Sequence, residues 1–331
     1  MGFVLSKRTR GLKLLGIEEL KERIELTRTT VECPVKGCSE RVEIQHRNTR
    51  RNEARFTCPV HRIVITPSTF KYPNRLDNLL WKEPSDRELL DRIKKVKRES
   101  RMAWDNSEDA VSWNVFRFLE RNNLIEGCLE SITGTSVKSA EVIYWSYSQR
   151  EDTGWSLLDR VRREFGELEK RGSEPDIIIS TDRVLLFIEA KMTSGNKPGH
   201  SNIASSAAYQ TGAGNWFSKV FRSDYESVAK DKYELMRFWL LGTWIAEQQG
   251  LDFRLINLVL SKREKDIEAT FKRHIREDQR NRFLRVTWET IHEYISKSSP
   301  TSDRDIMMRY FRNKTIGYRN GRLQRAFPSI S

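Results

Sequence analysis

Two short apolar runs, each bounded by charge, most constrain how this chain can fold. Ile177–Ile179 and Val184–Ile188 consist of aliphatic, mostly β-branched residues and one phenylalanine, with a short polar connection between them. This pattern predicts a buried β-hairpin. Because side chains alternate along a strand, Glu189 and Lys191 share one face, and the antiparallel turn carries them back toward Asp176. The pattern therefore predicts three charged groups at one edge of an apolar sheet.

Two carboxylates in that position need a positively charged partner. Asp176 and Glu189 would repel each other and raise each other's pKa on an apolar support unless a cation lay between them. An all-oxygen site with few protein ligands suits Mg²⁺ or Mn²⁺. The alternative is an ordinary hairpin whose ends are solvated by charge.

The string Pro175-Asp176, twelve residues, then Glu189-Ala190-Lys191 resembles the signature of the PD-(D/E)XK nuclease superfamily. The resemblance implies an α/β, restriction endonuclease-like mixed sheet flanked by helices. It implies that Asp176, Glu189 and the Ala190 carbonyl hold the metal, and that Lys191 orients or deprotonates the attacking water. Phosphodiester hydrolysis would leave a 3′-hydroxyl and a 5′-phosphate. The superfamily includes restriction enzymes, resolvases and phage-defence nucleases, so the implied activity is an endodeoxyribonuclease of restriction or phage defence.

The resemblance also suggests supporting residues. In the superfamily an acid on the first core helix often completes the metal shell, which makes Glu108 the candidate and Asp109 the alternative. Acids in the first turn of a helix are favoured by its dipole in any case. Members often carry a glutamine and a tyrosine on the helix after the catalytic strand, which here suggests Gln210, and Tyr233 with Arg237 on the following helix.

Three of the four cysteines lie close together and predict a structural zinc site. Cys33 and Cys38 form one short turn, and Cys58 with His61 forms a second. Two such ligand pairs match tetrahedral zinc better than a disulfide scheme in a reducing compartment. Four protein ligands leave no open position for water, so the zinc would be architectural. The alternatives are buried free cysteines with a surface histidine, or His46 in place of His61.

The basic charge predicts a polyanionic partner. The net charge is +13, and phosphate backbones are the commonest partners of such proteins, although an anionic membrane surface or solubility alone would also accommodate it. We expect double-stranded DNA and no membrane, and leave a homodimer open. Contact with phosphate is expected from a basic loop and from the polar loop after the hairpin. These residues are Arg47, Arg50, Arg51, Lys197 and His200.

Length and composition predict several modules. A chain of 331 residues exceeds the common single-domain size. We expect a basic zinc-ribbon-like module at 1–82, a linker helix at 83–101, the nuclease-like domain at 102–298 and a basic tail at 299–331. The tail is either a DNA-clamping arm or a packed helix with a frayed end.

Periodicity predicts the elements of these modules. Helices are expected at 17–26, 106–119, 155–168 and 233–246, and strands at 41–46, 62–67, 141–147, 253–260 and 283–287. No apolar run approaches the roughly 20 residues needed to cross a bilayer. The start of the chain becomes basic too early for a secretory signal, so we expect a cytoplasmic protein. Rival functions are a non-catalytic DNA-binding protein on a nuclease-like fold and a nuclease specific for RNA or branched DNA.

Overall fold

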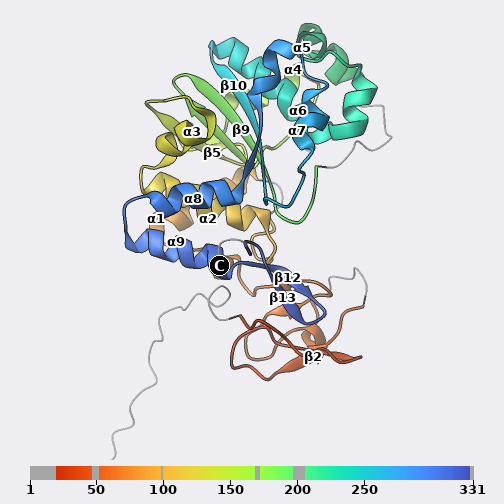
Figure 1. The fold of residues 1–331 in the computed structure, drawn as a ribbon, viewed down its shortest axis with the longest axis vertical. Coiled ribbons are helices and arrows are strands. Elements are labelled where there is room, and N and C mark those ends of the chain that lie inside the picture. The colour runs from red at the N-terminus through yellow and green to blue at the C-terminus, as the bar shows by residue number, and fades with distance from the viewer. Residues whose placement is uncertain (1–19, 47–51, 98–99, 168–171, 197–205, 329–331) are drawn as a thin grey trace, which may run out of the picture.

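The two apolar runs form the antiparallel strands β8 (Ile177–Thr181) and β9 (Val184–Lys191), as the sequence predicts. Every residue of β9 is buried, as expected for a strand covered on both faces. The computed structural model describes residues 20–46, 52–97, 100–167, 172–196 and 206–328. Figure 1 shows a helix-covered sheet and, at the other end of the molecule, a smaller N-terminal module.

The hairpin lies inside a seven-stranded mixed sheet of order β11-β10-β9-β8-β5-β6-β7. β10 (Asp252–Val259) is parallel to β9, and β11 (Phe283–Thr287) is parallel to β10. On the other side, β5 (Ala140–Tyr144) is antiparallel to β8, and the short strands β6 (Tyr147–Ser148) and β7 (Thr153–Gly154) follow it. The strands predicted near 141, 253 and 283 are therefore confirmed, and the chain has an α/β fold.

Helices cover both faces of the sheet and produce two apolar cores. One core contains α1 (Pro84–Val96), α2 (Glu108–Arg121), α3 (Ile125–Thr133), α8 (Trp288–Lys297) and α9 (Ser302–Asn313). The other contains α4 (Ser156–Glu164), α5 (Ser206–Val220, interrupted at 212–215), α6 (Tyr225–Gln249) and α7 (Ile267–Lys272). None of the helices within the described ranges is long and apolar enough to cross a membrane.

The alternation of β9 decides which core its charged end faces. Leu186 and Ile188 lie in the core with α2, whereas Leu185 and Phe187 lie in the core with α6. Glu189 continues the second set, because successive side chains of a strand point to opposite faces. The charged end of β9 therefore lies on the α6 side of the sheet.

The linker helix predicted at 83–101 exists as α1, but it packs into the core that contains α2 and is not a free connection between modules. Leu89 and Ile93 are buried in the core shared with α2. The fully buried Asp86 accepts hydrogen bonds from Arg117 at 2.7 Å and Arg121 at 2.9 Å. These ion pairs hold α1 against α2 in one relative position. Separating the two helices would leave the buried Asp86 carboxylate without its cationic partners, which is costly.

The N-terminal module is built from short antiparallel pairs. β1 (Thr30–Glu32) pairs with β2 (Arg41–Glu43), and β3 (Val64–Ile65) pairs with β4 (Phe70–Lys71). The strands expected at 41–46 and 62–67 thus exist but belong to separate pairs. Single 3₁₀ turns are η1 (Ala54–Phe56) and η2 (Arg75–Asn78), and η5 (Glu277–Arg282) precedes β11.

The helix predicted at 17–26 is wrong for its described part. Residues 20–26 instead form isolated bridges, one of them between Leu20 and Val35. The amide of Lys21 donates to the carbonyl of Pro34, and that of Ile24 donates to the carbonyl of Gly321, both at 2.8 Å. These distant carbonyls replace the internal bonds of a helix, and local periodicity contains no information about them.

The C-terminal segment is packed as far as it is described, which excludes a free arm up to residue 328. After α9 it forms the hairpin of β12 (Thr315–Arg319) and β13 (Arg322–Arg325), which Figure 1 shows beside the N-terminal module. Tyr318 belongs to that module's core. Gly317 has a φ of +115°, and a Cβ there would lie 1.9 Å from the carbonyl oxygen of Ser68. Described segments from the N-terminal and the C-terminal parts of the chain therefore build this module together.

Candidate active site and metal centre

The charged groups at the ends of β8 and β9 meet, as the sequence predicts. Asp176 precedes β8, and the pairing of Ile177 with Ile188 sets it beside Glu189. Its Oδ2 accepts a hydrogen bond from the Ala190 amide at 2.9 Å. The Lys191 ammonium forms an ion pair with Glu189. These contacts bring two carboxylates and one ammonium together at one sheet edge.

The surroundings change the proton affinity of all three groups. Burial raises the pKa of Asp176 to about 7, although Lys191 opposes the rise. Burial likewise raises the pKa of Glu189 well above its usual value, with Lys191 opposing and Asp176 adding to the shift. Burial lowers the pKa of Lys191, but the carboxylates, Glu189 foremost, outweigh it and hold this pKa above its usual 10.5. The lysine is therefore charged at neutral pH.

Glu234 of α6 is a further charged group of this site that the sequence reasoning missed. Its Oε2 lies 3.0 Å from Nζ of Lys191. Its charge also contributes to the raised pKa of Glu189. The only signal in the sequence was its neighbour Tyr233, because nothing in the helical pattern shows that this face of α6 meets the end of β9.

Glu108 and Asp109 lie near the site but have different contacts. Oε1 of Glu108 accepts hydrogen bonds from the amides of Met192 at 2.7 Å and Thr193 at 3.3 Å, and from the hydroxyl of Ser194 at 2.8 Å. Glu108 therefore fixes the chain where it leaves β9. Asp109 instead raises the pKa of Asp176 by its charge, so its field reaches one of the two metal-ligand candidates.

The charge of Asp109 is partly balanced by Lys97 at the end of α1. Nζ of Lys97 lies 3.2 Å from Oδ1 of Asp109 and 3.8 Å from Oε2 of Glu174. It also lies 4.5 Å from the ring centre of Trp145, whose Nε1 donates to Oδ1 of Asp176 at 3.3 Å. Helix α1 thus contributes a cation to the border of the site.

The residues suggested on the later helices separate into two groups. Gln210 is exposed on α5. Tyr233 makes an edge-on contact with Tyr209, at 6.1 Å between ring centres, and Nε of Arg237 donates to the Tyr209 hydroxyl at 2.8 Å. That hydroxyl donates to Glu167 at 2.5 Å. Tyr233 and Arg237 are therefore joined through Tyr209, whereas Gln210 lies on the exposed side of α5.

Glu167 connects this group to the segment that leads into β8. Its carboxylate also accepts hydrogen bonds from the amide and the hydroxyl of Ser173. Ser173 lies three residues before Asp176. A fixed Ser173 limits how far Asp176 can move, because so short a segment has few free dihedral angles.

A second polar cluster lies beside the site at the end of β10. Asn257, fully buried, is paired in register with Glu189. Its side-chain amide donates to Glu264 at 2.8 Å and its oxygen accepts from Asn196 at 2.8 Å. Lys232 of α6 lies 3.5 Å from Glu264. This cluster holds Asn196, in the segment after β9, in a fixed position.

The four expected zinc ligands come together in the N-terminal module. The ligand atoms of Cys33, Cys38, Cys58 and His61 all lie within 4.8 Å of one another. Sγ of Cys38 and Sγ of Cys58 are 3.9 Å apart, and Nδ1 of His61 is 3.6 Å from Sγ of Cys33. A tetrahedral zinc site requires ligand separations of roughly 3.6–3.8 Å. The group can therefore bind a structural metal such as zinc.

The turns of this group have the backbone that such a centre requires. Gly37 has a φ of +75°, which a glycine adopts without strain, and the amide of Cys38 donates to the Val35 carbonyl at 3.2 Å. In the second turn the amide of Arg62 donates to the Cys58 carbonyl at 2.8 Å. His46 is not part of the group.

The residues expected to contact phosphate cannot be placed. They lie outside the described residues and are Arg47, Arg50, Arg51, Lys197 and His200.

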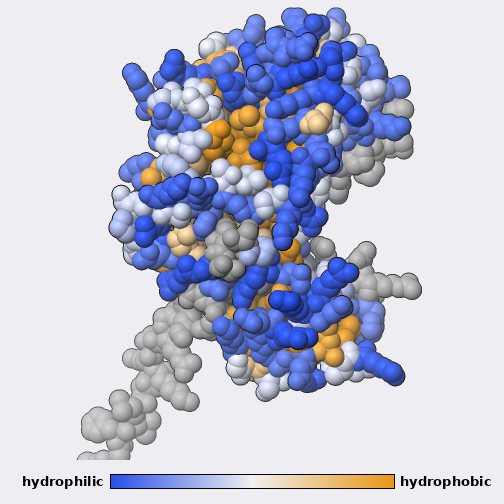
Figure 2. Space-filling model, in the orientation of Figure 1, coloured by the Kyte–Doolittle hydropathy of each residue, from blue (hydrophilic) through white to orange (hydrophobic). Residues whose placement is uncertain are grey.

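Figure 2 shows one face of the molecule, which is largely hydrophilic and has smaller apolar areas over the sheet and over the N-terminal module.

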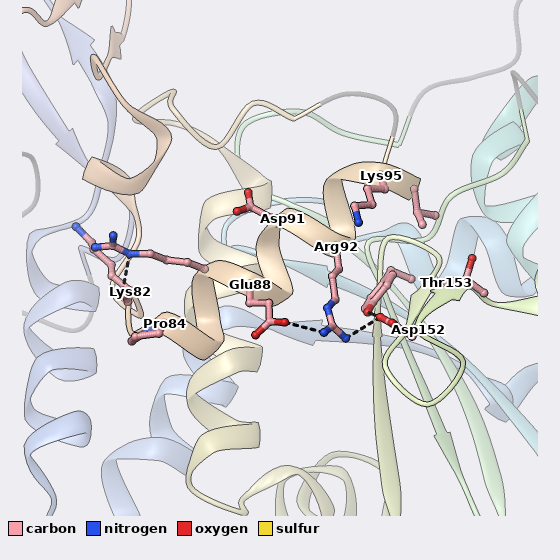
Figure 3. A pocket seen from close by; sticks show the side chains of 11 residues that line it. Lys82, Pro84, Glu88, Asp91, Arg92, Lys95, Asp152 and Thr153 are labelled. Carbon is pink, nitrogen blue, oxygen red and sulfur yellow. Dashed lines mark hydrogen bonds and ion pairs between the residues drawn. The ribbon is translucent and has the colours of Figure 1, made fainter.

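A groove of about 920 Å³ lies between α1 and the β6–β7 hairpin. Figure 3 shows Arg92 in contact with Glu88 and Asp152 in its wall. The lining carries four basic and three acidic side chains, so their charges almost cancel. The groove therefore has little attraction for a polyanion, and the sheet edge remains the candidate active site.

Comparison of the chain with family models, with curated proteins and with solved structures finds no match. The functional assignment therefore depends on the residues and their geometry.

Proposed function

We propose that this protein is a metal-dependent nuclease of the PD-(D/E)XK type that hydrolyses phosphodiester bonds in DNA. The observation that carries the proposal is the meeting of Asp176, Glu189 and Lys191 at one edge of the sheet. The resemblance of Pro175–Lys191 to the superfamily signature and the mixed α/β sheet support it.

The donor atoms of this edge fit a hard divalent cation such as Mg²⁺ or Mn²⁺. Asp176 and Glu189 would hold the cation through carboxylate oxygens, which these ions prefer. The charges of Asp176, Glu189 and Glu234 all act on the single ammonium of Lys191, so these four groups carry two excess negative charges when all are ionised. A divalent cation would balance that charge, and it would oppose the rise in pKa that burial causes at both ligands.

The chain's own groups would then act as follows. A bound divalent cation supplies Lewis-acid activation of water and neutralises charge on the phosphate. Lys191, whose pKa the neighbouring carboxylates raise, would act as a fixed cation that orients the water and stabilises the developing negative charge. Glu108 holds the chain directly after Lys191, which keeps the ammonium in position.

We also propose that the Cys33, Cys38, Cys58 and His61 group holds a structural zinc ion, and that the N-terminal module helps to bind nucleic acid. The net charge of +13 supports a phosphate backbone as partner. A closed four-ligand centre would stabilise a module whose strands β1 to β4 are only two or three residues long.

Plasmid DNA tests the activity. We expect cleavage with Mg²⁺ or Mn²⁺, and none without a divalent cation. Asp176→Ala and Lys191→Ala should abolish cleavage and leave the circular dichroism spectrum unchanged. Lys230→Ala, an exposed lysine on α6, is the matched control and should cleave normally.

Two other experimental outcomes would favour one of the rival functions instead. Retarded migration of DNA in a gel-shift assay without cutting would favour a non-catalytic DNA-binding protein. Cleavage of RNA or branched DNA, but not of the plasmid, would favour a nuclease of that specificity. Full activity of either alanine variant would refute the proposed active site.

A further inference from the structure

The ammonium of Lys191 lies between two carboxylates that come from different elements. Glu189, on the same strand, has a side chain only 5% exposed. Glu234 comes from α6, lies 3.0 Å from Nζ and is 37% exposed. The lysine therefore has one buried carboxylate partner, Glu189, and one that is partly exposed to solvent, Glu234.

If the proposed function is correct, the Glu189 carboxylate interacts with two cations. Its carboxylate would be a ligand of the divalent ion, and it is also the ion-pair partner of Lys191. Two positive groups on one small carboxylate repel each other strongly at a site with little water. Binding of the divalent ion therefore requires that much of the interaction between Lys191 and Glu189 be replaced.

We propose that Glu234 is a positioning residue that holds the Lys191 ammonium while Glu189 binds the divalent cation. This inference rests on the proposed function and deepens it. Without Glu234, Lys191 would either remain on Glu189 and compete with the metal, or be a buried cation with too few partners, which is costly.

The packing around Glu234 suits this role. The next two residues, Leu235 and Met236, are fully buried in the core on the α6 side of the sheet. Tyr233 is held against Tyr209. Lys232 departs from helical geometry, with φ of −147° and ψ of 65°, and contacts Glu264. This turn of α6 is therefore fixed on both sides of Glu234, while the carboxylate itself is 37% exposed.

The test measures Mn²⁺ binding without nucleic acid, by electron paramagnetic resonance, with Asp176→Ala as the background for other Mn²⁺ sites. We expect Glu234→Gln to weaken Mn²⁺ binding about tenfold, because Lys191 then remains on Glu189. Glu247→Gln, an exposed glutamate on the same helix, is the matched control and should bind as the wild type does.

A second background separates positioning from direct ligation. Lys191→Met removes the competing ammonium, so adding Glu234→Gln to it should change Mn²⁺ affinity less than about twofold. An equal loss in both backgrounds would show that Glu234 is itself a metal ligand and would overturn the inference. Wild-type affinity in Glu234→Gln would overturn it as well.

Failure of the inference can be distinguished from failure of the proposed function. If Asp176→Ala removes no Mn²⁺ binding, the metal site itself is refuted and the inference fails with it. If the expected coupling between Glu234 and Lys191 is found, the positioning role is supported, and the plasmid assay tests the nuclease activity separately.

Discussion

Replacing Asp176 by asparagine should stabilise the protein while abolishing its activity. Burial raises the pKa of Asp176 from 3.8 to about 7, so the folded chain holds this proton more tightly than the unfolded chain does. Stability therefore falls as the pH rises through that window, and ionised Asp176 destabilises the fold above it. Each tenfold change in proton affinity corresponds to about 1.4 kcal/mol, so the full effect is about 4 kcal/mol.

Two features reduce the gain expected for the variant. Asp176 retains some contact with solvent, which screens part of the effect. Asparagine can still accept the hydrogen bond from the Ala190 amide, but it loses the weak one from Trp145. We therefore expect Asp176→Asn to raise the free energy of unfolding by about 2 kcal/mol at pH 8 and by about a third of that at pH 5.

Urea denaturation at the two pH values, without added divalent cations, measures the difference. Asp266→Asn is the matched control, because this aspartate is exposed and its side chain does not cap α7. It should change stability little at either pH. An Asp176→Asn variant that is no more stable than the wild type at pH 8, or equally stabilised at both pH values, would refute the reasoning about this carboxylate.

Three further predictions concern other parts of the molecule. Cys58→Ser should remove zinc, as measured by atomic absorption, and lower the melting temperature, because a structural ligand contributes folding energy; unchanged zinc content would contradict the assignment. Gly317→Ala should cost about 3 kcal/mol or more in urea denaturation, because its Cβ would overlap the Ser68 carbonyl; wild-type stability would show that the hairpin does not dock there. Glu108→Gln should bind Mn²⁺ normally, because glutamine still accepts the hydrogen bonds from residues 192–194; a large loss would make Glu108 a metal ligand.

The hairpin could be predicted from the sequence because its signals are local. Strand β9 is apolar throughout until its charged end, and its partner β8 is connected by only two residues. With so short a connection the register follows, and the meeting of Asp176 with Glu189 follows from the register. The Cys and His spacing predicted the metal centre for the same reason, since each pair of ligands lies in one short turn.

The partners of these groups could not be predicted, because they come from distant parts of the chain. Glu234 reaches Lys191 only because α6 packs across the end of β9. Glu108 and Asp109 are adjacent in sequence, yet one bonds the chain after β9 and the other acts on Asp176. Sequence alone could not choose between them, because the choice depends on how α2 is rotated against the sheet.

Local signals in the chain were thus sufficient to predict the central hairpin, the identity of its charged ends and the four candidate zinc ligands. Long-range contacts were needed to show that residues 20–26 form isolated bridges instead of a helix and that the C-terminal hairpin completes the N-terminal module. In both cases backbone groups bond to partners hundreds of residues away along the chain. Free energy from such contacts exceeds the small local preferences that periodicity reports, so the fold overrides the pattern where the two disagree.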